Sequence, residues 1–189
     1  MLIEIQGVSG DLKSQSIQLT NGMTALVDDD QFDLLMQYRW SAVSFRGGKY
    51  WYAGFMPWNG GGKRRTIFMH RMIANPPAGL VVDHINGNTL DNRVANLRVC
   101  TRGQNAINRK KSTTPTSSVY KGVSWSKNAW QAAVCVGQKH QYLGRFKSER
   151  DAAIAYDVAA AKVFGEFANL NFPVAPLISP PSIQIMSRR

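Results

Sequence analysis

The chain has 189 residues, of which 44% are hydrophobic, so it can bury the core of one medium domain or two small ones, which argues against disorder throughout. Lysine and arginine (23) outnumber the acidic residues (12), for a formal net charge of +11. The two cysteines form no Cys-x-x-Cys pair, so we expect neither a structural zinc site nor a disulfide framework. The first residues, MLIEIQGVSGDLKS, contain no basic region followed by a long apolar stretch, and we expect a soluble, cytoplasmic protein.

The positive charge is concentrated in residues 101–150, which hold ten Lys or Arg and one acidic residue, for a net charge of +9. Aromatic residues are interleaved with these charges: Tyr120, Trp125, Trp130 and Tyr142. Neutralised phosphates release counterions and aromatic faces pack on sugars or bases, so the pattern favours a polyanionic partner. The alternative is a solvated basic surface. An anionic membrane is disfavoured, because the chain has no long apolar run and no basic amphipathic helix.

Short strands separated by glycine-containing turns are predicted for the first third of the chain. The expected strands are residues 16–20, 24–28, 49–55 and 64–70. A helix is expected over residues 30–40, because Phe32, Leu35 and Met36 share one helical face. A short helical segment at residues 69–74 is then stopped by two prolines.

A polar segment follows, VVDHINGNTLDNRVANLRVCTRGQNAINRK, which divides into strand, loop, strand and helix. Residues 80–84 read as a strand and 86–93 as a loop with an Asn-Gly turn. In the second strand, Ala95, Leu97 and Val99 alternate with Asn96 and Arg98. Thr101 is suited to cap a helix from about residue 102 to 110, on which Asn105, Asn108 and Arg109 share one side.

Two readings of the adjacent Asp83 and His84 are possible: a surface pair in a polar loop, or a component of a phosphodiesterase site. An imidazole that titrates near neutral pH is a suitable general base, which is the role we predict for His84. Asp83 and Asn105 offer the oxygen ligands that Mg²⁺ or Mn²⁺ prefer, and one such ion acts as a Lewis acid on the phosphate and leaving oxygen. Asn96 is expected to fix the imidazole or to tie down the loop.

The motif D-H-I-N-G-N-x-x-x-N-x-x-x-N-L-R, read from Asp83 to Arg98 and followed by Asn105, resembles the HNH nucleases with a ββα-metal fold, in the His-Asn-Asn form. It looks most like the free-standing homing-type endonucleases of phage genomes, and Met69-His70-Arg71 matches them too. The resemblance covers roughly residues 15–110. It implies that His84 is the general base, that Asp83 and Asn105 bind the metal, and that Asn96 is structural.

The remaining polar residues of this region have simpler expected roles. Asn86, Gly87, Asn88 and Asn92 are expected to form the loop and nothing more. His70 is either a core residue or a phosphate ligand. The expected phosphate contacts are His70, Arg71, Arg98, Arg109, Lys110 and Lys111, since guanidinium groups match phosphate oxygens bidentately.

Beyond the polar linker, strands are predicted at residues 120–126, 129–136 and 140–146, then a helix from Ser148 to Phe164 that ends at Gly165. From Pro173 the proline-rich tail is expected to be irregular. Residues 119–172 resemble the Apetala/ethylene-response-factor DNA-binding domain, through Tyr120-Lys121-Gly122-Val123, Trp130, Leu143-Gly144-x-Phe146, the alanine-rich run from Ala152 to Ala160, Phe164-Gly165 and Asn169-Leu170-Asn171-Phe172.

That resemblance implies a three-stranded antiparallel sheet with one helix behind it, whose strands enter the major groove. The expected DNA contacts are Lys121, Trp125, Lys127, Trp130, Lys139, Tyr142 and Arg145, with a core position as the alternative for Trp130. The sequence departs from the plant pattern, because Ser124, Ser126 and Cys135 stand where base-reading arginines are frequent. A target sequence is therefore not transferable, and binding is expected to rest more on phosphates and shape.

Together these features predict an α+β protein: a nuclease domain at 1–111 (a β-rich region at 1–69 and a ββα-metal core at 70–111), a linker at 112–118, a DNA-binding domain at 119–172 and an irregular tail at 173–189. The expected activity is metal-dependent cleavage of duplex DNA. A monomer would nick one strand, while a double-strand break needs a dimer or two sequential cuts. If the chain is phage-encoded, it acts in the bacterial cytoplasm. The alternatives are a DNA-binding regulator with an inactive nuclease domain and, more weakly, an RNA-binding module.

Overall fold

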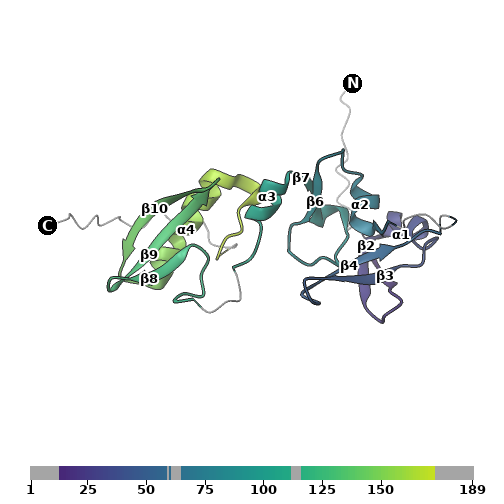
Figure 1. Ribbon diagram of the computed structural model, residues 1–189, viewed down its shortest axis with the longest axis horizontal. Helices are drawn as coiled ribbons and strands as arrows, with labels where there is room; N and C mark the ends of the chain where they lie inside the picture. Colours follow the sequence, from purple (N-terminus) through teal and green to yellow (C-terminus); the bar gives the residue numbers. More distant parts are fainter. Residues whose placement is uncertain (1–12, 59, 61–64, 112–115, 173–189) are drawn as a thin grey trace, which may run out of the picture. The chain divides into compact units, whose positions relative to one another are not determined.

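The computed structural model describes residues 13–58, 60, 65–111 and 116–172, and these fall into two compact units that divide between Thr101 and Arg102 (Figure 1). Each unit is described by itself. The predicted tail, most of the 59–62 glycine turn and residues 112–115 of the predicted linker lie outside the described residues.

The first unit is built on two small antiparallel sheets and a short helix. Their bounds are β1 (Ser14–Gln18), β2 (Thr24–Asp28), α1 (Asp29–Leu35), β3 (Ser41–Phe45), β4 (Tyr50–Phe55) and β5 (Ile67–Phe68). β1 pairs with β2, and β4 lies between β3 and β5. A single core cluster unites them: Ile17, Leu19, Ala25, Val27, Leu35, Trp40, Ala53 and Met69. Trp40 is fully buried, and its indole N–H donates to the Leu35 carbonyl at 2.8 Å, so the end of α1 is tied into this core.

The polar segment of the sequence forms a helix and a hairpin at one side of this unit. Its elements are α2 (Met69–Ala74), β6 (Val81–His84), the 3₁₀ turn η1 (Val94–Asn96) and β7 (Leu97–Cys100). In the antiparallel β6–β7 register, Asp83 stands opposite Arg98 and His84 opposite Leu97. α2 ends at Ala74, and its C-cap Asn75 has a left-handed backbone (φ 39°), with the Pro76-Pro77 pair directly after it.

The second unit contains a three-stranded antiparallel sheet covered by one long helix. Its elements are α3 (Arg102–Ile107), β8 (Val123–Ser126), β9 (Ala129–Val136), β10 (Lys139–Phe146), α4 (Glu149–Phe164) and η2 (Gly165–Phe167). β9 is the central strand, and α4 lies across one face of the sheet (Figure 1). The fully buried alanines Ala132, Ala152, Ala153 and Ala160 leave little side-chain bulk between helix and sheet. Ser148 caps α4, its side chain accepting from the Asp151 N–H at 3.4 Å.

The expected mixture of helices and strands in small sheets is confirmed, including the three C-terminal strands and α4. β3 was not predicted: residues 41–45 hold two serines and little hydrophobic alternation, and they form a strand because β4 supplies the partner. Asn96 was expected within a strand and lies instead in η1. The predicted domain limits and the ββα-metal arrangement stay predictions. No helix of the described residues has the length and apolar character needed to cross a membrane.

Candidate active site

His84 ends β6 in a buried position surrounded by other rings. Its side chain is 5% exposed, and its ring centroid lies 5.1 Å from that of His70 and 6.0 Å from that of Tyr52. Burial lowers the pKa of His84, while a contact with Asn92 and the nearby Asp83 charge oppose that shift. The imidazole is therefore neutral at neutral pH and can accept a proton.

Asp83 precedes His84 on β6 and is paired with Arg98 on β7. The Oδ2 atom of Asp83 accepts from Nε of Arg98 at 2.9 Å and from Nη2 at 2.7 Å. Both side chains are nearly buried, with 6% exposure for Asp83 and 10% for Arg98. The strand register places the two residues directly opposite each other, so the negative charge of the buried carboxylate is compensated by Arg98 within the hairpin. The predicted contact of Arg98 with phosphate stays a prediction.

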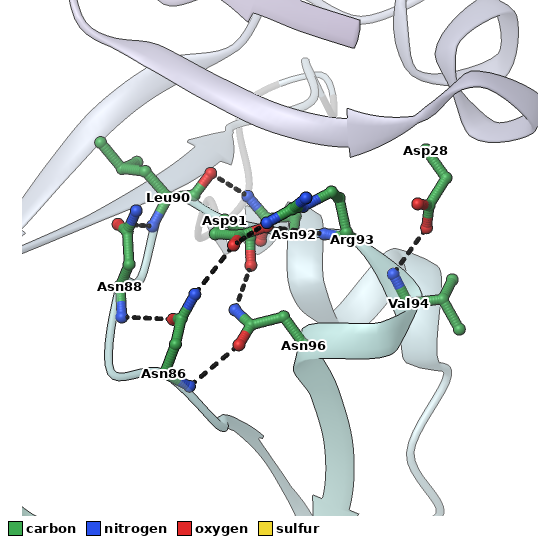
Figure 2. Close-up of polar contacts among 9 residues, drawn as sticks. All are labelled: Asp28, Asn86, Asn88, Leu90, Asp91, Asn92, Arg93, Val94 and Asn96. Atoms are coloured by element: carbon green, nitrogen blue, oxygen red, sulfur yellow. Dashed lines mark hydrogen bonds and ion pairs between the residues drawn. The ribbon is translucent and has the colours of Figure 1, made fainter. Parts of the chain in front are cut away.

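Asn96 ties down the loop between the two strands, which is one of the two roles predicted for it. Its Oδ1 accepts from the Asn86 N–H at 2.9 Å, and its Nδ2 donates to the Asp91 carbonyl at 2.7 Å. Figure 2 shows these side chains converging on Asp91, which also accepts from Asn86 Nδ2 at 2.8 Å. A different asparagine of the loop, Asn92, reaches His84, with its Oδ1 3.4 Å from Nε2 of the imidazole.

Asp91 is the charged centre of this loop. It is buried, and its two oxygens accept from Nε and Nη2 of Arg93 at 2.8 and 2.7 Å, as seen in Figure 2. The hydrogen bonds from Arg93, followed by that from Asn86, hold the pKa of Asp91 below its usual value. Asn88 continues the network on the exposed side, accepting from the Leu90 N–H at 3.1 Å. The loop-forming roles predicted for Asn86 and Asn88 agree with these bonds.

The N-terminal hairpin holds the other side of the same loop. The buried Asp28 at the end of β2 accepts from the Val94 N–H at 2.6 Å. The Leu26 N–H donates to the Leu90 carbonyl at 2.9 Å, and the Asn92 N–H donates to the Leu26 carbonyl at 2.8 Å. β2 is therefore a structural support of the site, which its sequence pattern did not indicate.

His70, on α2, is buried beside His84. It is 8% exposed, its ring stacks on Phe68 with centroids 5.6 Å apart, and within the described residues its Nδ1 has no hydrogen-bond partner. Burial, followed by the neighbouring His84 and Arg71, lowers the pKa of His70 to about 3. Of its two predicted roles, the core position agrees with this burial, and phosphate binding stays a prediction. The adjacent Arg71 is exposed and donates to the Leu80 carbonyl at 3.4 Å.

The predicted metal ligands are divided between the two units. Asp83 belongs to the first, whereas Asn105 is on α3 of the second, so their joint coordination of a metal stays a prediction. Among the described residues, no group of three or more His, Cys, Asp or Glu side chains is arranged to hold a metal ion.

Several basic residues predicted to contact DNA make bonds within the second unit. Lys121 donates through Nζ to the carbonyls of Ile107 and Arg109, both at 2.7 Å, and burial lowers its pKa. Lys111 donates to the Tyr120 carbonyl at 2.8 Å. These bonds fasten the end of α3 and the basic segment Arg109, Lys110 and Lys111 to the start of the sheet domain.

The face of the sheet opposite α4 carries some of the predicted DNA-binding residues. Val123 and Ala132 pack toward the helix, so their neighbours Ser124 and Gln131, which are paired across β8 and β9, point the other way. Arg145 pairs with Gln131 on that outer face, where Tyr142, opposite Ala133, is 57% exposed. Gln131 shares this outer face and was not among the predicted contacts, because a glutamine within a strand carries no signal of its own.

The other predicted DNA contacts in this unit lie elsewhere. Trp130 lies on the face of the sheet that α4 covers and packs against the core cluster, which agrees with the core position given as the alternative for this residue. Trp125 is half exposed and meets Trp130 edge to face at 4.9 Å. Lys127 sits in the β8–β9 turn with a left-handed backbone (φ 50°), where its carbonyl accepts from Arg145, and Lys139 begins β10, exposed. Their DNA contacts stay predictions.

Sequence comparison places the hairpin among known nucleases. Residues 70–107 match the family model described as HNH endonuclease. An uncharacterized HNH endonuclease of Acanthamoeba polyphaga mimivirus is 31% identical over 153 residues, which cover 79% of this chain and 75% of the relative. Protein 3.8 of Escherichia phage T7 is 38% identical over 86 residues, or 43% of this chain and 70% of that protein.

A different set of relatives consists of plant regulators. An AP2-like ethylene-responsive transcription factor of Arabidopsis thaliana is 34% identical over 100 residues, which is 47% of this chain and 21% of the plant protein. A second such factor, also from Arabidopsis thaliana, is 43% identical over 60 residues, or 30% of this chain and 12% of the factor. These matches span only a small fraction of the plant proteins.

Proposed function

The chain belongs to the HNH endonuclease family and is a DNA-cleaving enzyme, and on that basis we propose that it hydrolyses phosphodiester bonds of duplex DNA with His84 as the general base. The observation that carries the proposal is the neutral, buried imidazole of His84 at the end of β6, next to Asp83. A neutral imidazole accepts a proton from water, and the resulting hydroxide attacks phosphorus as the bond to the leaving oxygen breaks.

The surroundings of His84 suit this role. The rings of Tyr52 and His70 lie near the imidazole, and His84 is only 5% exposed, so bulk water is largely excluded from the base. The loop cannot shift freely, because Asn96 and Asp91 bind it from within and Asp28 binds it from β2. Fixed geometry matters, since a general base must lie within hydrogen-bond reach of the proton it removes.

HNH endonucleases generally use a divalent metal ion, and the oxygen donors predicted from the sequence are of the type that a hard ion prefers. Asp83 offers a carboxylate and Asn105 an amide oxygen, which we propose as the ligands of one Mg²⁺ or Mn²⁺. When bound, such an ion supplies charge neutralisation at the phosphate and the leaving oxygen. Arg98 holds the Asp83 carboxylate in place on the hairpin and supplies positive charge beside it.

The second unit is proposed to hold the DNA duplex. Tyr142, Arg145 and Gln131 share the face of the sheet that α4 leaves uncovered, and a sheet of this size can enter a major groove. The net charge of +9 in residues 101–150 favours phosphate contact. Affinity for duplex DNA should therefore fall steeply as salt is raised.

The experiment that tests the proposal is incubation of the purified chain with supercoiled plasmid, with and without Mg²⁺ or Mn²⁺, followed by mapping of any nick. We expect nicking that needs the metal and that His84→Ala abolishes, with DNA affinity retained within a few-fold. His140→Ala, which removes the histidine of the second unit, should keep the cleavage rate at saturating DNA. Persistent nicking by His84→Ala would remove this residue as the base, and no nicking by the wild type would favour a regulator. Competition between duplex DNA and RNA for binding to the chain tests which nucleic acid it prefers.

A further inference from the structure

Asn92 was expected to form a turn, but it is one of the most deeply buried polar residues of the first unit, with 1% exposure. Its backbone N–H donates to the Leu26 carbonyl at 2.8 Å, and its side-chain Nδ2 donates to the Leu90 carbonyl at 3.2 Å. Its Oδ1 lies 3.4 Å from Nε2 of His84. Asn92 therefore contacts both the β2 scaffold and the proposed base.

The orientation of this amide follows from its neighbours. Oxygen and nitrogen of an asparagine amide are told apart by their hydrogen-bond partners, and a carbonyl oxygen only accepts. Because Leu90 presents a carbonyl, the amide group facing it must be the NH₂, and Oδ1 must then face His84. Figure 2 shows the Asn92 side chain within this loop, with its bond to Leu90.

An acceptor at this position selects one form of the imidazole. Oδ1 of Asn92 has no proton to give, so Nε2 of His84 has to carry the hydrogen when the two atoms bond. In a neutral ring the second nitrogen, Nδ1, then carries the lone pair. Reversing the tautomer would place two lone pairs against each other in a buried site.

We propose that Asn92 is a positioning residue that holds His84 as the Nε2–H tautomer, so that Nδ1 is the atom that removes the proton from the attacking water. This inference rests on the proposed nuclease function. Water gives its proton to Nδ1, its oxygen forms the new bond to phosphorus, and the bond to the leaving oxygen breaks, that oxygen taking a proton from solvent. The imidazolium so formed keeps its Nε2–H bond to Asn92, which is stronger for a charged donor.

The support for Asn92 comes from a segment of the chain outside the matched family region of residues 70–107. Leu26 of β2 forms a parallel bridge with Asp91, and its backbone accepts from Asn92 and donates to Leu90. The N-terminal hairpin thus orients the amide that orients His84. A positioning role predicts that changes at Asn92 act on the reactive ring and on the rate, with DNA binding preserved.

The direct test is the multiple-bond ¹H–¹⁵N correlation spectrum of the full chain, which distinguishes the two imidazole tautomers. It is recorded without metal at about pH 8, above the ordinary histidine pKa of about 6.5. The chain has three histidines, and His84→Gln identifies the resonances of His84. We expect the Nε2–H form in the wild type and a loss of that preference in Asn92→Ala. A wild-type spectrum with the Nδ1–H form overturns the proposal, whether or not any variant folds.

Single-turnover plasmid nicking supplies the second measurement. Asn92→Ala should lower the rate at saturating DNA by at least about 10-fold, a fraction of the roughly 10²- to 10⁴-fold that a positioned base supplies, with an unchanged KM for DNA. Asn92→Asp keeps an acceptor oxygen toward Nε2 but loses the donor to the Leu90 carbonyl, so it should keep the Nε2–H tautomer and recover only part of the rate. Val94→Ala, which shortens an exposed side chain in the same hairpin and leaves its backbone bond to Asp28 in place, should alter neither. A folded Asn92→Ala protein with wild-type tautomer and rate refutes the role. If the wild type nicks nothing, the proposed function fails, and the spectrum still decides whether Asn92 sets the tautomer.

Discussion

Replacing His70 with phenylalanine removes a titratable group from the interior of the first unit, and the consequence should be seen in the pH dependence of stability. The phenyl ring keeps the aromatic contacts with Phe68, Tyr52 and His84. It also removes the buried Nδ1 atom that has no partner among the described residues. The informative quantity is the change in unfolding free energy with pH, because the larger ring has its own packing cost.

The size of the effect follows from the pKa of His70, about 3 in the folded protein against about 6.5 when unfolded. Below pH 6.5 the unfolded chain binds a proton that the folded chain does not, so stability is full above that pH and falls as the pH decreases toward 3. Between pH 6 and pH 4 the wild type should lose about 2 to 3 kcal/mol through this group alone. The His70→Phe variant should lack that loss.

The assay is urea denaturation at several pH values with chelator present. Unfolding is monitored by hydrogen exchange of peptides from residues 13–101, so that the first unit is measured by itself. Subtracting the variant from the wild type cancels contributions shared by both, such as that of Asp91. Parallel pH profiles, within about 0.5 kcal/mol, would refute the reasoning and show that His70 is solvated or paired in solution.

Two further predictions concern the loop and the sheet domain. Arg93→Ala removes two hydrogen bonds from the buried Asp91 and should destabilise the first unit by about 2 kcal/mol, a figure lowered for solvent screening because the Arg93 side chain is 40% exposed. The pKa of Asp91, measured by carboxyl NMR titration, should rise, and an unchanged pKa would contradict the pairing. Gly122→Ala places a Cβ 1.9 Å from the Tyr156 ring at a residue with φ +74°, and should destabilise the second unit by about 3 kcal/mol or more in thermal unfolding. Gly137→Ala, with φ +64° and no atom within 4 Å, is the matched control at about 1 kcal/mol, and equal losses would count against the predicted contact.

Much of the local structure could be predicted because it depends on short-range patterns. Alternating apolar residues indicated the strands of the second unit, Ser148 and Gly165 bounded its helix, and Asn86-Gly87 marked the hairpin loop. α1 was predicted to run to residue 40 but ends at Leu35. The reason is tertiary: Trp40 is needed in the core, and its indole bonds the Leu35 carbonyl. β3 could not be predicted, because its pairing with β4 is what makes a strand of a weakly patterned segment.

The candidate site, like the fold, was predicted only in part from the sequence. The order of residues alone makes Asp83 and His84 neighbours in a polar hairpin, and the motif through Arg98 indicated a nuclease. The folded chain was needed to show that Asp83 pairs with Arg98, that Asn96 holds the loop, and that Asn92 is the amide at the imidazole. The sequence alone does not distinguish the four asparagines between residues 86 and 96. They differ in burial and in which donor or acceptor lies opposite, and for Asn92 that depends on Leu26 of β2, more than fifty residues earlier in the chain, which accepts its backbone N–H.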